Sequence, residues 1–143
     1  MTYNEYIIGK CAIIDWNQYK KIAINSFVLD EEMQIEQLEE ALHEISKLDN
    51  NMMVYASTYP IEKNENGIGM FSDMLWIKTK LSVTLLEELF SKYRQIEPSA
   101  VFALTEEEKG HAELYIDTGF QSKEFAIVSD AFNLEEIKVL YWD

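Results

Sequence analysis

Apolar residues recur every three or four positions between Asp30 and Asp49, and this spacing predicts an amphipathic α-helix. Asp30 is the expected N-cap, because its carboxylate can accept a hydrogen bond from a free backbone N–H of the first turn. Lys47, in the last turn, carries the charge that the helix dipole favours there. The buried stripe of this helix is predicted to consist of Ile35, Leu38, Leu42, Ile45 and Leu48.

Two strands are predicted after this helix. Residues 52–59 include one valine, one threonine and two tyrosines, which favour a strand, and Pro60 is expected to end it. Residues 70–79 form the second candidate strand. The polar, glycine-containing residues 62–69 between them predict a turn or hairpin loop. A connection of this length suits an antiparallel pair, since a parallel pair needs a longer crossover.

A second amphipathic helix is predicted over residues 83–95. Thr84 and Glu87 have the spacing of a capping box, and Ser82 is an alternative N-cap. Pro98 prevents the helix from continuing, because proline lacks a backbone N–H and its ring clashes with the preceding turn. The buried stripe is predicted to be Val83, Leu86, Leu89, Phe90 and Tyr93.

The two ends of the chain have less regular patterns. Thr2 and Glu5 match a capping box, which predicts a first helix, with Ile14 at the end of its apolar stripe, although its β-branched residues favour a strand. Asp15 is expected to cap a short second helix over residues 16–24. Near the carboxyl end, residues 134–142 are predicted as a helix capped by Asn133, with an edge strand over 138–141 as the alternative. Three further strands are predicted at residues 99–104, 112–117 and 124–128.

This order of elements predicts an α+β fold. We expect a single globular domain over residues 1–143, with a mostly antiparallel sheet of about five strands and the two main amphipathic helices packed on one face. The hydrophobic content of 48% is typical of a folded domain, and no apolar run approaches the roughly 20 residues that a membrane helix needs. The amino-terminal residues lack the basic region of a signal peptide. A single cysteine, Cys11, fits a reducing compartment, and we expect a cytoplasmic protein.

Charge is the most informative property of the composition. The chain has 26 acidic and 12 basic residues, for a formal net charge of −14. Residues 51–100 are nearly neutral, with 6 acidic and 5 basic residues, so the excess lies in the two flanks. An acidic surface disfavours direct binding to nucleic acid or to an anionic membrane, because both attract basic patches. It allows attraction to a basic protein partner, although acidic surfaces also serve solubility alone.

The leading hypothesis is therefore a non-enzymatic binding protein, such as an immunity protein or inhibitor that occludes a basic partner. Small acidic α+β proteins of this kind resemble the chain in size and charge, without a shared motif. Self-association through exposed strands or the aromatic carboxyl terminus, including Trp142, is a further hypothesis. The residues expected to meet the partner are Glu32, Glu36, Glu39, Glu40, Glu44, Glu106, Glu107 and Glu108.

The alternative hypothesis is a small-molecule binder or an enzyme with a pocket between the helices and the sheet. No P-loop, dinucleotide-binding or nucleophile-elbow motif is present, so we predict no catalytic residue and no cofactor. Glu39 and His43 stand one helical turn apart, but two scattered histidines lack the spacing of a metal site, and we predict no metal. The polar residues proposed for the alternative pocket are Tyr55, Tyr59, Asp73, His111, Glu113 and Asp117.

Overall fold

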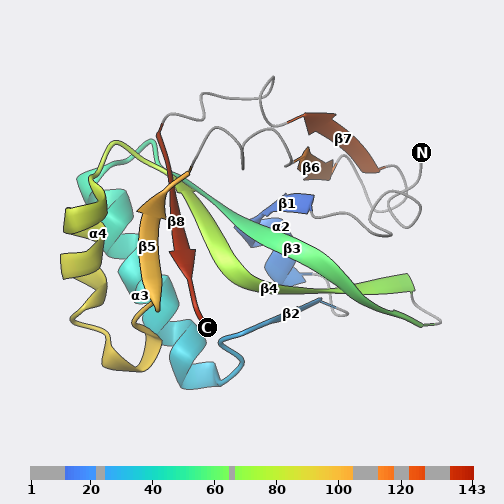
Figure 1. Ribbon diagram of the computed structural model, residues 1–143, viewed down its shortest axis with the longest axis horizontal. Helices are drawn as coiled ribbons and strands as arrows, with labels where there is room; N and C mark the ends of the chain where they lie inside the picture. Colours follow the sequence, from blue (N-terminus) through green and yellow to red (C-terminus); the bar gives the residue numbers. More distant parts are fainter. Residues whose placement is uncertain (1–11, 22–24, 65–66, 105–112, 118–122, 128–135) are drawn as a thin grey trace.

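The computed structural model describes residues 12–21, 25–64, 67–104, 113–117, 123–127 and 136–143 (Figure 1). The helices within these ranges are α2 (Trp16–Lys21), α3 (Glu32–Leu48), α4 (Val83–Phe90) and the 3-10 helix η1 (Arg94–Ile96). The strands are β1 (Ala12–Asp15), β2 (Asn25–Phe27), β3 (Met53–Asn64), β4 (Gly67–Lys78), β5 (Ala100–Ala103), β6 (Glu113–Asp117), β7 (Lys123–Ile127) and β8 (Ile137–Tyr141).

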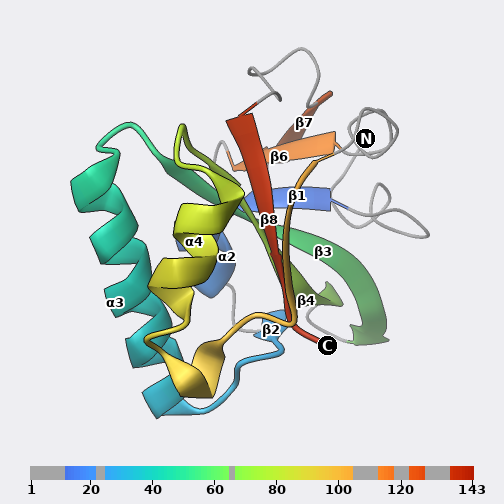
Figure 2. The ribbon, with the colours of Figure 1, turned by 60° about the vertical axis from the view of Figure 1, so that its left-hand side comes forward.

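One mixed sheet organises the fold. Its strands lie in the order β5-β8-β4-β3-β1-β6-β7, and β2 pairs with the first half of β4, while β8 pairs with the second half of that strand. The pairs β1–β6 and β2–β4 are parallel, and the other pairs are antiparallel. The prediction of a mostly antiparallel α+β fold is therefore confirmed. Figure 2 shows α3 and α4 together on one side of this sheet, as expected.

The long helix α3 forms where the apolar period predicted it. Leu38, Ala41, Leu42 and Ile45 are buried, and Asp49 ends the helix. Two details of the prediction are wrong. The N-cap is Glu31, whose backbone N–H donates to the side chain of Gln34 at 3.2 Å, in place of Asp30. Leu48 is 59% exposed, because it is the last residue of the helix and the chain turns away toward β3 after it.

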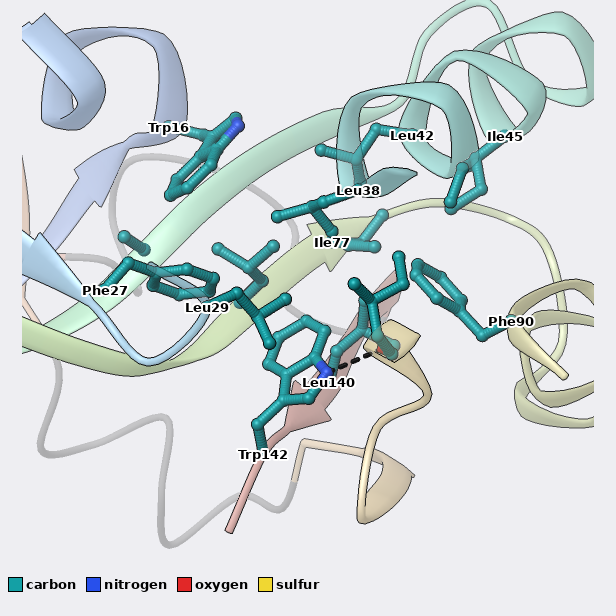
Figure 3. Packing of buried hydrophobic residues seen from close by; sticks show 14 of the residues in the cluster. Trp16, Phe27, Leu29, Leu38, Leu42, Ile45, Ile77, Phe90, Leu140 and Trp142 are labelled. Carbon is teal, nitrogen blue, oxygen red and sulfur yellow. Dashed lines mark hydrogen bonds between the residues drawn. The ribbon is translucent and has the colours of Figure 1, made fainter. Parts of the chain in front are cut away.

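The main hydrophobic core lies between the helices and the sheet (Figure 3). Leu38, Leu42 and Ile45 of α3 meet Ile77 and Leu140 of the sheet there. The core continues to Trp142, which is 5% exposed and whose indole N–H donates to the carbonyl oxygen of Ile96 at 2.8 Å. Phe27 contacts the Trp142 ring edge to face, with the ring centroids 5.6 Å apart. The expectation that Trp142 is an exposed interface residue is therefore wrong.

A second cluster covers the opposite face of the sheet. It consists of Ile13, Tyr55, Trp76, Leu104, Ile137 and Val139, with Met74 and Phe102 packed against it. Ile13 belongs to this cluster while Ile14 belongs to the main core, as alternation along a strand requires. The amino-terminal helix prediction is thus wrong at Ile14, which lies in β1, and residues 1–11 lie outside the described part. The short helix predicted after Asp15 is confirmed as α2, and Asp15 Oδ1 accepts from the backbone N–H of Gln18 at 3.1 Å.

The central hairpin is longer than predicted. β3 continues past Pro60 to Asn64, and β4 begins at Gly67, so most of the predicted loop over 62–69 is strand. The register of the pair shifts between Pro60 and Glu62. A proline is tolerated at such an irregularity, since the ladder is already interrupted there. The antiparallel pairing of the two strands is confirmed.

Two further boundaries differ from the prediction. α4 ends at Phe90, and the hydroxyl of Ser91 donates to the carbonyl oxygen of Glu88 at 2.6 Å, a local hydrogen bond that competes with continued helix. The N-cap is the alternative Ser82, which accepts from Leu85 N–H at 3.1 Å. The predicted carboxyl-terminal helix is wrong, because residues 137–141 form the strand β8. The alternative of a strand over 138–141 is confirmed, but it lies between β4 and β5 and not at the edge of the sheet. Within the described residues, no helix is long and apolar enough to cross a membrane.

Candidate functional site

The outward face of α3 carries the acidic residues that the sequence singled out. At 100° per residue, Glu32, Glu36 and Glu40 fall on one side of the helix, opposite the buried stripe. All three are exposed. Within the described part of the chain, none of them forms an ion pair. Their carboxylates are therefore available to an approaching molecule.

Glu39 is on the same helix, but its carboxylate contacts two residues of α2. Its Oε1 lies 2.7 Å from Lys20 Nζ and accepts a hydrogen bond from the indole N–H of Trp16 at 3.2 Å. The Lys20 ammonium also lies 5.6 Å from the centre of the Trp16 ring. Glu39 thus joins α2 to α3. Such a half-exposed ion pair contributes up to about 1 kcal/mol, because water screens both charges.

Glu44, the last of the five glutamates on α3, lies at the side toward α4. Its Oε2 is 4.0 Å from Lys92 Nζ, and both side chains are substantially exposed. The ring hydroxyl of Tyr93 has a raised pKa, because of burial and the nearby negative charge of Glu44. The five glutamates therefore divide into three without an ion pair among the described residues and two that contact neighbouring elements.

A first groove of about 400 Å³ lies between α3, the start of α2 and the start of β3. Its polar side chains include Glu39 and His43, which stand one turn apart and were considered as metal ligands. Among the described residues, no three His, Cys, Asp or Glu side chains gather in a way that could hold a metal ion. The groove is lined by Asp15, Trp16, Asn17, Glu39, Leu42, His43, Ser46, Met52, Met53 and Val54.

A second groove of about 580 Å³ lies between α4 and the edge strand β5. This groove could not be predicted from the sequence, because it depends on which strand forms the edge of the sheet. Three glutamates and a proline line it, and the partly exposed Val101 supplies apolar surface. Its lining residues are Glu87, Glu88, Phe90, Ser91, Glu97, Pro98, Ser99, Ala100 and Val101.

Of the residues proposed for the alternative pocket, the three whose side chains are described line neither groove. Tyr55 is buried in the second cluster, where desolvation and the negative charge of Asp15 raise the pKa of its hydroxyl to about 12. Tyr59 is 39% exposed and contacts the Phe71 ring. Asp73 is half-buried, and burial raises its pKa, with a smaller contribution from Asp143.

The remaining sequence candidates are placed only in part. Glu113 and Asp117 lie at the two ends of β6, where they pair with Ile127 and Lys123 of β7, and their side chains are outside the description. Glu106, Glu107, Glu108 and His111 lie outside the described residues. The hypothesis of a small-molecule pocket built from these residues therefore stays a prediction.

Comparison with known proteins adds no functional information. No protein family, no curated protein and no solved structure matches the chain.

Proposed function

We propose that this chain is a non-enzymatic binding protein that meets a basic protein surface with the outward face of α3. The observation that carries the proposal is the row of Glu32, Glu36 and Glu40 on successive turns, exposed and without ion-pair partners among the described residues. The net charge of −14 adds a long-range attraction for a basic molecule. An immunity protein or inhibitor acting in the cytoplasm, where the single Cys11 stays reduced, fits this description.

The proposed mechanism is occlusion of the partner's basic surface. Exposed carboxylates accelerate the encounter of two oppositely charged proteins, and an apolar contact slows dissociation. Met33 supplies an apolar contact, since it is 56% exposed and stands three residues from Glu36, a spacing that makes them neighbours on the helix surface. The glutamates therefore set the association rate, and Met33 contributes to the lifetime of the complex.

The first test is capture of a partner from a lysate of the source organism. The chain is immobilised and washed at about 50 mM and about 500 mM salt, because salt at these levels screens exposed charges to different degrees. We expect a basic protein that is retained in stoichiometric amount at low salt and released at high salt. Retention of no protein under either condition contradicts the proposal.

The second test measures association with the purified partner. The triple variant Glu32→Gln, Glu36→Gln and Glu40→Gln should associate with the partner about tenfold more slowly at low salt, because electrostatic steering raises association rates about tenfold or more. The matched control changes the same three residues to Asp, which keeps the charge and shortens the side chains, and it should associate at nearly the normal rate. An on-rate that the Gln variant leaves unchanged would refute the role of this face.

A further inference from the structure

Within the described residues the sheet ends at β5, whose only strand partner there is β8. Leu104 N–H donates to the carbonyl oxygen of Ile137 at 3.1 Å. In an antiparallel pair, successive residues direct their backbone groups alternately toward the partner strand and away from it, so this bond shows which residues of β5 face β8. Ala100 and Phe102 therefore direct their backbone groups toward β8, whereas Val101 and Ala103 direct theirs outward. In Figure 1 β5 lies at the outer side of β8, next to α4.

Among the described residues, the outward edge of β5 lacks most of the features that protect exposed strands. Edge strands are commonly blocked by lysine, proline or a covering element, because unpaired backbone groups otherwise bind another strand. The sequence of β5 is AVFA, with no charge and no proline within it. Its protection is its short length of four residues. Two outward residues can still exchange up to four backbone hydrogen bonds with an added strand.

The second groove runs beside this edge and is acidic. Glu87, Glu88 and Glu97 line it and are exposed, and none of the residues that line it is basic. Pro98, Ala100 and Val101 give it an accessible apolar side, whereas the ring of Phe90, which also borders it, is fully buried. A strand added to β5 would point alternate side chains to the same face of the sheet as Val101, which is the face that α4 covers.

We propose that the β5 edge binds an extended basic segment of a partner protein, which joins the sheet as an additional strand. Backbone pairing with Val101 and Ala103 supplies affinity, and Lys or Arg side chains directed to the groove contact the three glutamates. A second copy of this chain is disfavoured as the occupant, because two paired edges would bring six glutamates and two chains of net charge −14 together. This surface is distinct from the α3 face, so the inference does not rest on the proposed function.

The probe is a fluorescent eight-residue peptide of alternating Lys and Val, measured by anisotropy against the full chain at about 50 mM salt. We expect saturable binding that Ala103→Pro weakens about tenfold or more, because proline removes an outward N–H and leaves the bonds to β8 in place. Ala103→Ser is the matched control. It keeps the N–H at the same exposed position, and its affinity should stay within about twofold of the original, as expected for a surface substitution.

A second measurement keeps the test decisive if Ala103→Pro does not fold. The unchanged chain is titrated with the same peptide carrying N-methyl groups on its backbone amides, which retains every charge but cannot pair as a strand. We expect binding to be lost. Equal binding of the methylated and unmodified peptides, or of the Pro and Ser variants, would overturn the proposal.

Charge is tested separately. The triple variant Glu87→Gln, Glu88→Gln and Glu97→Gln should bind the peptide several-fold more weakly at low salt, while the matched α3 variant with three Gln substitutions should bind it normally. The reverse pattern would overturn the inference and would leave the α3 proposal standing. Sedimentation over a concentration series tests whether a second copy of the chain binds this edge. A dimer that Ala103→Pro abolishes would assign the edge to that second copy and would overturn the proposal.

Discussion

Two buried tryptophans show how the same residue type takes different roles in the two faces of the sheet. Trp142 and Trp76 are similarly buried, at 5% and 4% exposure. The indole N–H of Trp142 donates to Ile96, which fixes η1 against the end of β8. The indole N–H of Trp76 is buried without a hydrogen-bond partner among the described residues. A buried donor without a partner is costly, so the two rings contribute differently to stability.

These roles lead to a prediction for the matched substitutions Trp142→Phe and Trp76→Phe. The first leaves the Ile96 carbonyl without its donor, whereas the second removes a donor that had no acceptor. We expect Trp142→Phe to lower the free energy of unfolding by about 1–3 kcal/mol more than Trp76→Phe does, because this is the cost of leaving one buried group unsatisfied. Urea denaturation followed by circular dichroism measures both. Equal losses would show that ring volume alone determines the effect.

At the scale of elements, the sequence predicted structure best where one period extends over many residues. The 17 residues of α3 repeat their apolar positions often enough to define a helix and its buried side. The helix prediction for the segment that forms β8 was wrong because β8 is an interior strand of only five residues. Ile137 and Val139 belong to one cluster and Leu140 belongs to the other, so apolar residues lie on both faces of the strand and their spacing fits a helix equally well.

The two candidate sites also differ in whether local sequence patterns could predict them. The acidic face of α3 could be predicted, because a helix places its charged residues by local spacing alone. The β5 edge could not, because β5 becomes an edge only when β8, from the far end of the chain, inserts between it and β4. Strand order is a long-range property that no local pattern of polar and apolar residues encodes.

The junction between α3 and α4 depends on Asp49. Its carboxylate accepts from the Thr79 hydroxyl at 2.7 Å, from Lys80 N–H at 3.0 Å and from Asn51 N–H at 3.1 Å. The hydrogen bond from Thr79 and then those from the backbone lower the pKa of Asp49 below its ordinary value of 3.8. These bonds therefore stabilise the ionised side chain next to a helix carboxyl end, where the dipole disfavours a negative charge.

This lowered pKa predicts a pH-dependent contribution to stability. Because the folded state holds Asp49 ionised more strongly than the unfolded chain does, the contribution is full above pH 3.8 and is lost as the pH falls through the lower folded pKa. The Asp49→Asn variant should therefore have a lower free energy of unfolding than the original chain at pH 7. The gap, defined as the difference between the two free energies, should narrow below about pH 4. Denaturation at several pH values measures the gap, which should be smaller throughout in a Thr79→Ala background. A gap of constant size down to about pH 2 would contradict the assignment.

At the scale of the whole molecule, repulsion outweighs local attraction between charges. The net charge is −14, and the ion pairs within the described residues are Lys20 with Glu39 and Lys92 with Glu44. The second pair is at 4.0 Å between largely exposed side chains, and pairs of this kind contribute little. Salt therefore removes more unfavourable than favourable interaction, because it screens the repulsion among all the acidic residues.

We accordingly expect added NaCl to stabilise the fold. Between about 20 mM and about 300 mM, the melting temperature should rise by about 2–5 °C, which corresponds to about 1 kcal/mol for a chain of this size. The variant with Gln at Glu32, Glu36 and Glu40 has three fewer negative charges and should begin with a higher melting temperature and gain less from salt. Differential scanning calorimetry measures both chains. A melting temperature that falls with salt would mean that the Lys20–Glu39 contact outweighs the repulsion of the acidic surface.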